Sequence, residues 1–250
     1  MESRRAKDLL RRARKLSQLV FNPAYRRGLR YGVAAAVEHE QIVKLCKIDV
    51  LIDIGANVGQ FSLLVLAAHP HANVIAFEPL IEPADRFSRL FRDDDRITLH
   101  HVATGSAAGE AIIHVTARND SSSLLPIGRL QKEINGSEEV EVRKINVSRV
   151  DDLIDPNILR GAIFVKIDVQ GFELEALKGM AQTLTRVNNI YVEISFVPLY
   201  EGQPLVNDII RWLDSMGFII QAVHNITRRA DGTCVQADFL FGRCESAHSS

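Results

Sequence analysis

Short apolar runs alternate with longer amphipathic segments along most of the chain. Buried parallel strands read as continuous apolar runs, so we expect strands where β-branched residues cluster between polar breaks. The predicted strands cover 50–55, 73–78, 97–103, 163–168 and 189–194. The predicted helices cover 58–68, 81–91, 173–184 and 204–216. This alternation indicates an α/β fold with a mostly parallel sheet and helices on both faces.

The two ends of the chain carry further elements. Apolar residues at helical spacing predict helices within 1–45, with a break at Asn22-Pro23 and a second helix over 33–45. Near the other end, apolar runs at 218–223 and 235–241 flank a polar stretch that holds an Asp-Gly turn signal. This pattern predicts an antiparallel strand pair that closes one edge of the sheet.

Residues 105–150 interrupt the alternation of strands and helices. They contain strand-like runs at 111–115 and 140–145 and a polar loop at 118–124. We expect this segment to be an insertion over the rim of an active site rather than a separate domain. The loop holds three consecutive serines, which suit hydrogen bonding to a polyhydroxylated ligand and are also ordinary turn residues.

The first predicted strand of the sheet runs into a turn that carries two glycines, Gly55 and Gly59. Glycine lacks a Cβ, so the backbone can turn sharply and approach a ligand closely at these positions. The helix that follows points free N–H groups at the same space. The next strand ends in Glu78, and an acid at this place accepts hydrogen bonds from both ribose hydroxyls in nucleoside sites. The pattern therefore predicts a nucleoside site.

The spacing of the glycines indicates which nucleoside cofactor to expect. A dinucleotide fingerprint reads G-x-G-x-x-G, whereas Asn57 stands where the second glycine would be. Asp53 lies in the same turn, where a carboxylate repels phosphate and attracts a cation or an amino group. S-adenosylmethionine carries a sulfonium and an amino group and no phosphate, so it fits better than a nicotinamide dinucleotide. A nicotinamide-dependent oxidoreductase is the alternative, which a binding test with both cofactors would decide.

A second strand-turn-helix unit repeats this logic further along the chain. An apolar strand ends in Asp168, Gly171 turns the chain, and an amphipathic helix follows. Glu193 stands near the end of the next strand. Ligands of open parallel sheets bind beyond the carboxyl ends of the strands, so we expect these acids around one rim with Asp53 and Glu78. Unpaired carboxylates are costly to bury, which favours a functional role for them.

Composition and charge are those of an ordinary globular protein. Hydrophobic residues make up 46% and charged residues 24% of the chain, and the net charge is −1. The charge is uneven, because residues 1–30 hold ten Lys and Arg against two acids, a local +8, and leave −9 for the rest. We expect the basic segment to pack on the acidic body, with a weak contact to a membrane surface or another anionic partner as the alternative. The acidic body disfavours nucleic acid as a partner.

The cysteines and the apolar segments bear on localisation. Cys46, Cys234 and Cys244 are odd in number and lack C-x-x-C spacing, so we expect neither a disulfide framework nor a zinc site. No apolar run approaches the roughly 20 residues that span a bilayer, and the basic start lacks the apolar core of a signal peptide. Reduced cysteines are typical of the cytoplasm, so the sequence predicts a cytoplasmic protein.

Taken together, the motifs resemble the FkbM-type S-adenosylmethionine-dependent methyltransferases. The resemblance rests on 53–59, 78–79, 102–104, 121–123, 166–173, 177–179, Glu193, 200–202 and 237–241. It extends over about residues 45–243 and implies a Rossmann-like, seven-stranded methyltransferase sheet, mostly parallel with an antiparallel C-terminal strand. Residues 1–44 would then be a basic helical extension and residues 244–250 a tail.

The resemblance also implies an activity and a set of site residues. The activity is methyl transfer from S-adenosylmethionine to a hydroxyl oxygen of a small molecule or sugar. The implied cofactor-binding residues are Asp53, Gly55, Ala56, Asn57, Gly59, Phe61, Glu78, Pro79 and Ala103. Within this set, Glu78 would hold the ribose and Ala103 would border the adenine. Asp168 would lie between the sulfonium and the acceptor, as a base or as a ligand that orients the hydroxyl, with Glu193 as the second catalytic acid.

Two alternatives use the same residues. Asp168 and Glu193 could together hold a divalent ion such as Mg²⁺, which would lower the pKa of the hydroxyl, although no third ligand stands out. A non-catalytic module would bind the cofactor without turnover.

Gln170 replaces the glutamate more often written in this motif, which removes a charge and argues against a base at that position. Neither the acceptor nor the oligomeric state has a recognisable signal in the sequence.

Overall fold

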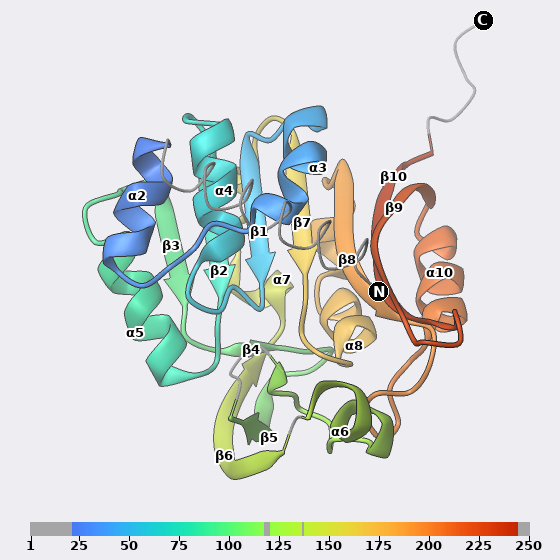
Figure 1. The fold of residues 1–250 in the computed structure, drawn as a ribbon. Helices are drawn as coiled ribbons and strands as arrows, with labels where there is room; N and C mark the ends of the chain where they lie inside the picture. The colour runs from blue at the N-terminus through green and yellow to red at the C-terminus, as the bar shows by residue number, and fades with distance from the viewer. Residues whose placement is uncertain (1–21, 118–120, 137, 245–250) are drawn as a thin grey trace, which may run out of the picture.

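The computed structural model describes residues 22–117, 121–136 and 138–244, and Figure 1 shows their arrangement. The main sheet has seven strands in the order β3-β2-β1-β7-β8-β10-β9. The strands are β1 (Val50–Ile54), β2 (Asn73–Phe77), β3 (Ile97–His100), β7 (Ile163–Ile167), β8 (Asn189–Ser195), β9 (Phe218–Arg228) and β10 (Cys234–Arg243). Among these strands, β10 runs in the direction opposite to the other six, which confirms the predicted sheet and its antiparallel C-terminal strand.

Helices cover both faces of this sheet. One face carries α2 (Pro23–Arg30), α3 (Glu40–Leu45), α4 (Gln60–Ala68) and α5 (Ile81–Leu90). The other carries α7 (Val150–Leu153), α8 (Glu173–Lys178), α9 (Ala181–Leu184) and α10 (Val206–Ser215). Two short 3-10 helices, η1 (Val37–His39) and η3 (Pro156–Ile158), complete this part of the fold. Within the described ranges, no helix combines the length and apolar character needed to cross a bilayer.

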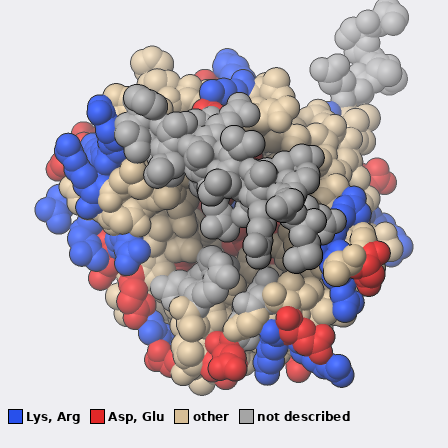
Figure 2. Space-filling view, in the orientation of Figure 1, with Lys and Arg blue, Asp and Glu red and all other residues tan. Residues whose placement is uncertain are grey.

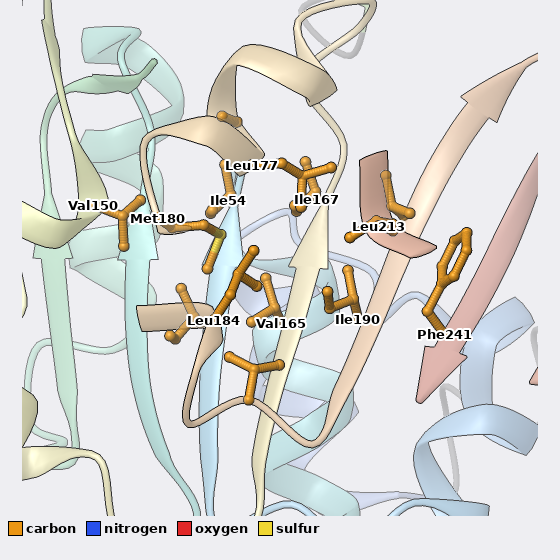
Figure 3. Close-up of a cluster of buried hydrophobic side chains, with 14 of the residues drawn as sticks. Ile54, Val150, Val165, Ile167, Leu177, Met180, Leu184, Ile190, Leu213 and Phe241 are labelled. Carbon is orange, nitrogen blue, oxygen red and sulfur yellow. The ribbon is translucent and has the colours of Figure 1, made fainter. Parts of the chain in front are cut away.

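The alternation of side chains along each strand divides them between two apolar cores. Ile52 and Val165 pack with the α7–α10 side, part of which Figure 3 shows. Leu51 and Phe164 pack with the α2–α5 side. Since residues two apart share a face, Asp53 also points toward the α2–α5 side. The Asp53 carboxylate is therefore buried within the fold.

The predicted insertion, 105–150, contributes two strands to a second, three-stranded sheet in the order β4-β6-β5, and β4 comes from the residues just before it. Its strands are β4 (Ala103–Thr104), β5 (Gly109–Thr116) and β6 (Glu139–Ser148), and α6 (Arg129–Asn135) lies between the last two. The prediction of one strand over 97–103 is wrong, because β3 ends at His100 and the chain then passes to the second sheet. The Val102 N–H donates to the His100 carbonyl over 3.0 Å, and this tight bend redirects the chain.

Two predicted helices are also different in the structure. The helix over 33–45 is wrong in its first part, because residues 33–36 form no helix and their burial alternates with period two. The Ala36 N–H donates to the Gln60 carbonyl of α4 over 3.1 Å, so tertiary contact replaces the helical bond there. The helix over 173–184 is split into α8 and α9, with Gly179 at the break. Predicted helical structure within 1–21 lies outside the described residues.

Basic side chains gather on the flank formed by α2 and α5, at the left of Figure 2. Arg30 from α2 and Arg86 and Arg89 from α5 line a shallow surface hollow there. Arg27 on the same flank donates to the Leu90 carbonyl over 3.2 Å, which ties α2 to the end of α5. This helix, the described part of the basic segment, packs against α4 and α5. Seven of the ten basic residues of the segment lie outside the described residues, so its packing on the acidic body stays a prediction. Its contact with an anionic partner stays a prediction.

The end of β10 is fixed at the amino ends of the parallel strands. The Arg243 guanidinium donates to the backbone carbonyls of Val187, Met216 and Leu184. Its central carbon also lies 4.3 Å from the centre of the Phe218 ring, a cation–π distance. One side chain therefore joins the starts of β8 and β9 to the end of β10.

Candidate active site

A cavity of about 390 Å³ lies at the carboxyl ends of β1, β2 and β7. This is where ligands bind in open parallel sheets. Four parts of the chain form its wall, namely the turn after β1, the end of β2, the segment after β7 and the segment before α3. The second sheet adds Ala103, Thr104 and Ile113, and the loop after β5 adds residues 122–124, so the insertion does border the cavity.

The turn after β1 is shaped by backbone that only certain residues tolerate. Gly55 has φ of +75°, and a Cβ there would lie 2.0 Å from the Asp168 carbonyl oxygen. Gly59 precedes α4 with φ of +92°, and a Cβ there would meet the rings of Phe87 and Phe91. Asn57 adopts φ of +49° between them. The turn can therefore lie close both to β7 and to a ligand in the cavity.

Glu78 is the buried acid at the tip of β2. Its Oε2 accepts from the Asn57 N–H over 2.9 Å and its Oε1 from the Leu80 N–H over 2.8 Å. Burial raises the pKa of Glu78 to about 7, although these two N–H groups act in the opposite direction. Each carboxylate oxygen can accept a further hydrogen bond, since it has more than one acceptor site. A wall residue of this kind fits the two hydroxyls of a ribose.

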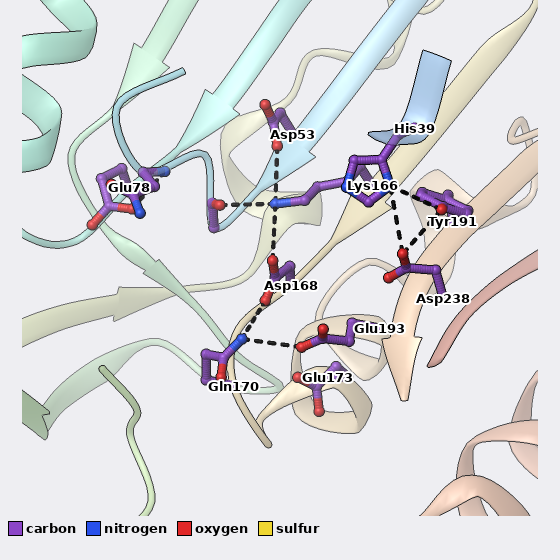
Figure 4. Close-up of polar contacts among 12 residues, drawn as sticks. His39, Asp53, Glu78, Lys166, Asp168, Gln170, Glu173, Tyr191, Glu193 and Asp238 are labelled. Atoms are coloured by element: carbon purple, nitrogen blue, oxygen red, sulfur yellow. Dashed lines mark hydrogen bonds and ion pairs between the residues drawn. The ribbon is translucent and has the colours of Figure 1, made fainter. Parts of the chain in front are cut away.

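A chain of charged groups crosses the floor of the site on β1 and β7 (Figure 4). The Lys166 ammonium lies 2.9 Å from the Gly55 carbonyl, 3.5 Å from Asp53 and 3.8 Å from Asp168. Asp53 is fully buried, and its other oxygen accepts from the Ser62 hydroxyl over 2.6 Å. Burial alone would lower the pKa of Lys166, but the surrounding carboxylates outweigh it and raise the pKa. The lysine therefore stays cationic and neutralises both acids.

Gln170 connects the two predicted catalytic acids. Its amide nitrogen donates to Asp168 over 2.6 Å and to Glu193 over 3.1 Å, while its carbonyl oxygen accepts from the Tyr200 hydroxyl over 2.9 Å. Glu193 also accepts from Gln236 over 2.5 Å. Burial and then the nearby Asp168 carboxylate raise the pKa of Glu193 well above its usual range. An amide at position 170 is therefore a donor to both acids.

Glu173 is a further buried acid at the start of α8. It is 2% exposed, and its Oε1 accepts from the Gly171 N–H over 2.8 Å. Its other oxygen is buried without a hydrogen-bond partner among the described residues. Burial raises the pKa of Glu173 to about 7. Glu173 does not line the cavity. Its hydrogen bond with Gly171 stabilises the turn that follows Asp168.

His39 is a site residue that the sequence patterns missed. It lies at the end of η1, lines the cavity and places its Nδ1 3.0 Å from the Tyr191 hydroxyl and 3.4 Å from Asp238. His114, which pairs with Glu139, and His224 are not among the residues that line the cavity. No local pattern marks His39, since its partners are some 150 to 200 residues away along the chain. The available signal was Tyr191, whose hydroxyl stands between two apolar residues in a strand.

The predicted site residues fall into two groups in the structure. Those that line the cavity are Gly55, Ala56, Asn57, Phe61, Glu78, Pro79, Ala103 and Asp168. Asp53 and Gly59 lie behind this wall, and Glu193 is reached from it only through Gln170. The four acids expected around one rim are thus divided, with Glu78 on the side of β2 and Asp168 on the side of β7.

The loop with three serines packs beside the cavity. Ser123 is buried and its hydroxyl donates to the Gln170 carbonyl over 2.5 Å, so the loop packs on the segment after β7. Ser122 lines the cavity.

Among the described residues, no three His, Cys, Asp or Glu side chains converge as a metal site. The role of a metal stays open to measurement.

The sheet order and the cavity at the carboxyl ends of the parallel strands are those of a Rossmann-like α/β fold. The sequence model of the Methyltransferase FkbM domain matches residues 53–220, about two thirds of the chain. This chain belongs to that family, and it is therefore an S-adenosylmethionine-dependent methyltransferase. The family resemblance predicted from the motifs is confirmed.

Named relatives agree with this assignment. The chain is 30% identical over 203 residues to 2-O-methyltransferase NoeI of Sinorhizobium fredii, covering 78% of this chain and 84% of that protein. It is 33% identical over 149 residues to hexuronic acid methyltransferase AglP of Haloferax volcanii, covering 58% and 56%. It is 24% identical over 200 residues to 31-O-demethyl-FK506 methyltransferase FkbM of Streptomyces tacrolimicus, covering 70% and 74%.

Solved structures show a distant likeness. Precorrin-6y C5,15-methyltransferase of Geobacter metallireducens aligns with a TM-score of 0.45 and 14% identity, covering 86% of this chain and 94% of its own. Magnesium protoporphyrin IX methyltransferase of Synechocystis, solved with bound S-adenosylmethionine, aligns with a TM-score of 0.40 and 14% identity, covering 83% and 81%.

Proposed function

We propose that this chain transfers a methyl group from S-adenosylmethionine to a hydroxyl oxygen of a sugar or a similar polyhydroxylated small molecule. The observation that carries the proposal is one cavity with a buried ribose-type acid, Glu78, on one side and Asp168 on the other. Relatives named for 2-O-methylation and for hexuronic acid support an acceptor of this kind. Both are methyltransferases whose names point to oxygen-rich acceptors.

The residues of the cavity have distinct tasks under this proposal. Glu78 accepts hydrogen bonds from the ribose hydroxyls of the cofactor. The turn at Gly55 and Asn57 borders the methionine part of the cofactor, and Ala103 borders its adenine. The cofactor supplies a methyl group on a positively charged sulfur, which is a good leaving group. Asp168 orients the acceptor hydroxyl toward that methyl group. Correct alignment of two reactants can lower a barrier by several kcal/mol.

Calorimetry with S-adenosylhomocysteine, with NAD⁺ as the comparison ligand, tests the cofactor half of the proposal. We expect saturable binding of the first and none of the second. Mass spectrometry of a panel of methyl glycosides, neutral and uronic, incubated with the protein and S-adenosylmethionine tests the acceptor half. A gain of one methyl group is the expected result. Absence of any affinity for the nucleoside would refute the proposal outright.

The variant Asp168→Asn tests the task given to Asp168. We expect turnover of the accepted glycoside to fall by about 10²-fold, since a small misplacement of one reactant has an effect of that size. Binding of S-adenosylhomocysteine should stay near the wild-type value. Asp214→Asn on the exposed side of α10 is the matched control and should leave both unchanged. Wild-type turnover in Asp168→Asn would remove this residue from the mechanism.

Removal of metal decides between an orienting carboxylate and a metal ligand. We expect turnover to be the same before and after dialysis against EDTA, because Lys166 and Gln170 already bind Asp168. If EDTA abolished turnover and Mg²⁺ restored it, the pair Asp168 and Glu193 would instead hold an ion that activates the hydroxyl.

A further inference from the structure

His39 comes from outside the part of the chain that the family model matches, yet it lines the same cavity as Glu78 and Asp168. Figure 4 shows it above the β7 and β8 strands, joined to Tyr191 and Asp238. We propose that His39 accepts the proton of the acceptor hydroxyl, with Asp238 and Tyr191 as its positioning residues. This inference rests on the function proposed above and adds a proton acceptor to it.

The ring of His39 is held by groups from three strands. Tyr191 of β8 donates its hydroxyl to Asp238 of β10 over 3.1 Å, and Asn225 of β9 donates its amide to the same carboxylate over 2.8 Å. His39 Nδ1 lies within 3.0 Å of the Tyr191 oxygen. The ring also contacts Phe61 of α4 edge-on, with centres 5.6 Å apart. These contacts fix both the position and the plane of the imidazole.

The same contacts favour one tautomer of His39. The Tyr191 hydroxyl donates to the Asp238 carboxylate, and its oxygen can then accept from a protonated Nδ1. The Asn225 amide nitrogen also lies 3.2 Å from Nδ1, but it donates to Asp238 over the shorter distance of 2.8 Å. The Asp238 carboxylate, 3.4 Å from Nδ1, favours a proton on that nitrogen as well. Nε2 then carries the free lone pair. It has no hydrogen-bond partner among the described residues, which leaves it available to a ligand in the cavity.

The charges that face His39 come from several elements. Burial is the largest effect and lowers the pKa of His39, whereas Asp238 on β10 and Glu38 on its own segment raise it. Lys166 on β7 lowers the pKa further, and Asp168 after β7 raises it. Since the net direction is downward from 6.5, the imidazole is neutral at pH 7 and able to take a proton.

Asp168 is less suited to take the proton, because its carboxylate already accepts from Gln170 and faces the Lys166 ammonium. The two residues therefore divide the task. As the acceptor oxygen bonds to the methyl carbon and the carbon–sulfur bond breaks, the hydroxyl proton moves to Nε2 of His39. The products are the methyl ether, the neutral thioether and an imidazolium. The imidazolium then releases its proton to water.

The variant His39→Gln tests the proposal with the glycoside that the wild type methylates best. We expect kcat to fall about 10²–10⁴-fold, the usual contribution of a general base. The dissociation constant of S-adenosylhomocysteine should stay within about twofold, since the proposed role is not in cofactor binding. His71→Gln, which changes an exposed histidine, is the matched control and should retain full activity. Retained kcat in His39→Gln, or a loss confined to cofactor affinity, would overturn the proposal.

A pH series separates a proton acceptor from a merely structural histidine. The wild-type kcat should rise with pH as His39 loses its proton, and the carbon resonance of His39 in NMR should titrate at the same pH. Asp238→Asn should move both midpoints down together, because it removes the carboxylate that raises the pKa of His39. This variant also serves if His39→Gln fails to fold. A His39 that is still protonated at pH 8, or a kcat midpoint that stays fixed in Asp238→Asn, would overturn the proposal.

The two proposals can fail separately. Loss of all affinity for S-adenosylhomocysteine in the wild type would refute the methyltransferase function and the inference with it. Normal affinity and normal turnover in His39→Gln would refute the inference alone.

Discussion

Buried carboxyl groups dominate the chemistry of individual residues in this protein. Glu78 and Glu173 are both nearly inaccessible to water, and burial raises the pKa of each to about 7. Asp53 is equally buried but has an ammonium beside it. The protonation of the first two therefore changes within the physiological range, and each change has a measurable consequence.

Glu78 should make cofactor binding depend on pH. Ribose hydroxyls donate to an ionised carboxylate, so binding favours the form that is populated above pH 7. We expect S-adenosylhomocysteine to bind about tenfold more weakly at pH 6 than at pH 8, since one unit below the pKa the acid is mostly protonated. Calorimetry at the two pH values measures this. Glu78→Gln should bind weakly at both, and an unchanged pH dependence in that variant would assign the effect to another group.

Glu173 should make stability depend on pH. Its folded pKa of about 7 lies above the ordinary value of 4.5, so its contribution to stability is fully present below pH 4.5 and lost as pH rises through 7. Against Glu173→Gln, the wild type should lose up to about 3 kcal/mol of unfolding free energy between pH 4.5 and 8. Urea unfolding at several pH values gives this difference, in which any constant effect of the substitution cancels. Parallel curves for the two proteins would contradict it.

Local sequence predicted many of the residues at the cavity wall and missed their supporting partners. Glu78 and Asp168 end apolar strands, and the strand end alone determines that they reach the rim. The inward orientation of Asp53 was harder to predict from the sequence. It depends on the register of β1 and β7, which places Asp53 beside Lys166. His39 depends on contacts with β8 and β10, which no spacing along the chain encodes.

At the scale of elements, the turn between β1 and α4 is the part that tolerates least change. Gly55→Ala should place a methyl group against the Asp168 carbonyl and move the turn, the segment after β7, or both. We expect binding of S-adenosylhomocysteine to weaken at least about tenfold, together with a fall in Tm, because overpacking of this kind typically destabilises by about 1–3 kcal/mol. Calorimetry and thermal unfolding provide the two readouts.

Gly136→Ala is the matched control for that substitution. Gly136 also has a positive φ, of +62°, but a Cβ there would meet no atom within 4 Å. The control should lower stability by about 1 kcal/mol through backbone strain and leave binding unchanged. Equal binding by the two variants would show that the close approach at Gly55 does not matter to the site.

Helices and strands were predicted well where an apolar run belongs to a single element. The run 218–223 is the start of a longer strand, β9, which continues to Arg228. The other strands of the main sheet lie within a residue or two of their predicted bounds, apart from 97–103. That run was misjudged because its apolar pattern continues across a bend into another sheet. The segment 33–36 was misjudged because apolar residues with period two stand next to a helical pattern. Both errors occur at borders between elements, where backbone hydrogen bonds to distant partners decide the outcome.

Across the whole molecule, the two ends of the sheet serve different purposes. The carboxyl ends of the strands form the cavity, with several ionisable groups at or behind its wall. The amino ends are closed by Arg243, which ties three chain segments together. We therefore expect that changes at the amino ends alter stability without altering the site.

Arg243→Ala tests this separation. We expect a loss of about 2–4 kcal/mol in unfolding free energy, because several backbone carbonyls lose a charged donor. Affinity for S-adenosylhomocysteine should be unchanged at a temperature where the variant is folded. Arg160→Ala, which removes one exposed hydrogen bond, should alter stability by no more than about 0.5 kcal/mol. A weakened affinity in folded Arg243→Ala would show that the two ends are coupled.

The segment that carries His39 runs ahead of the portion common to the family, and it forms part of the cavity wall. A lineage could exchange that stretch while retaining every glycine and acid that grips the nucleoside. If His39 accepts the proton as proposed, relatives with the same fingerprint need not share the same proton acceptor. Grafting this stretch onto one of them would carry the pH behaviour along only together with Tyr191, Asn225 and Asp238.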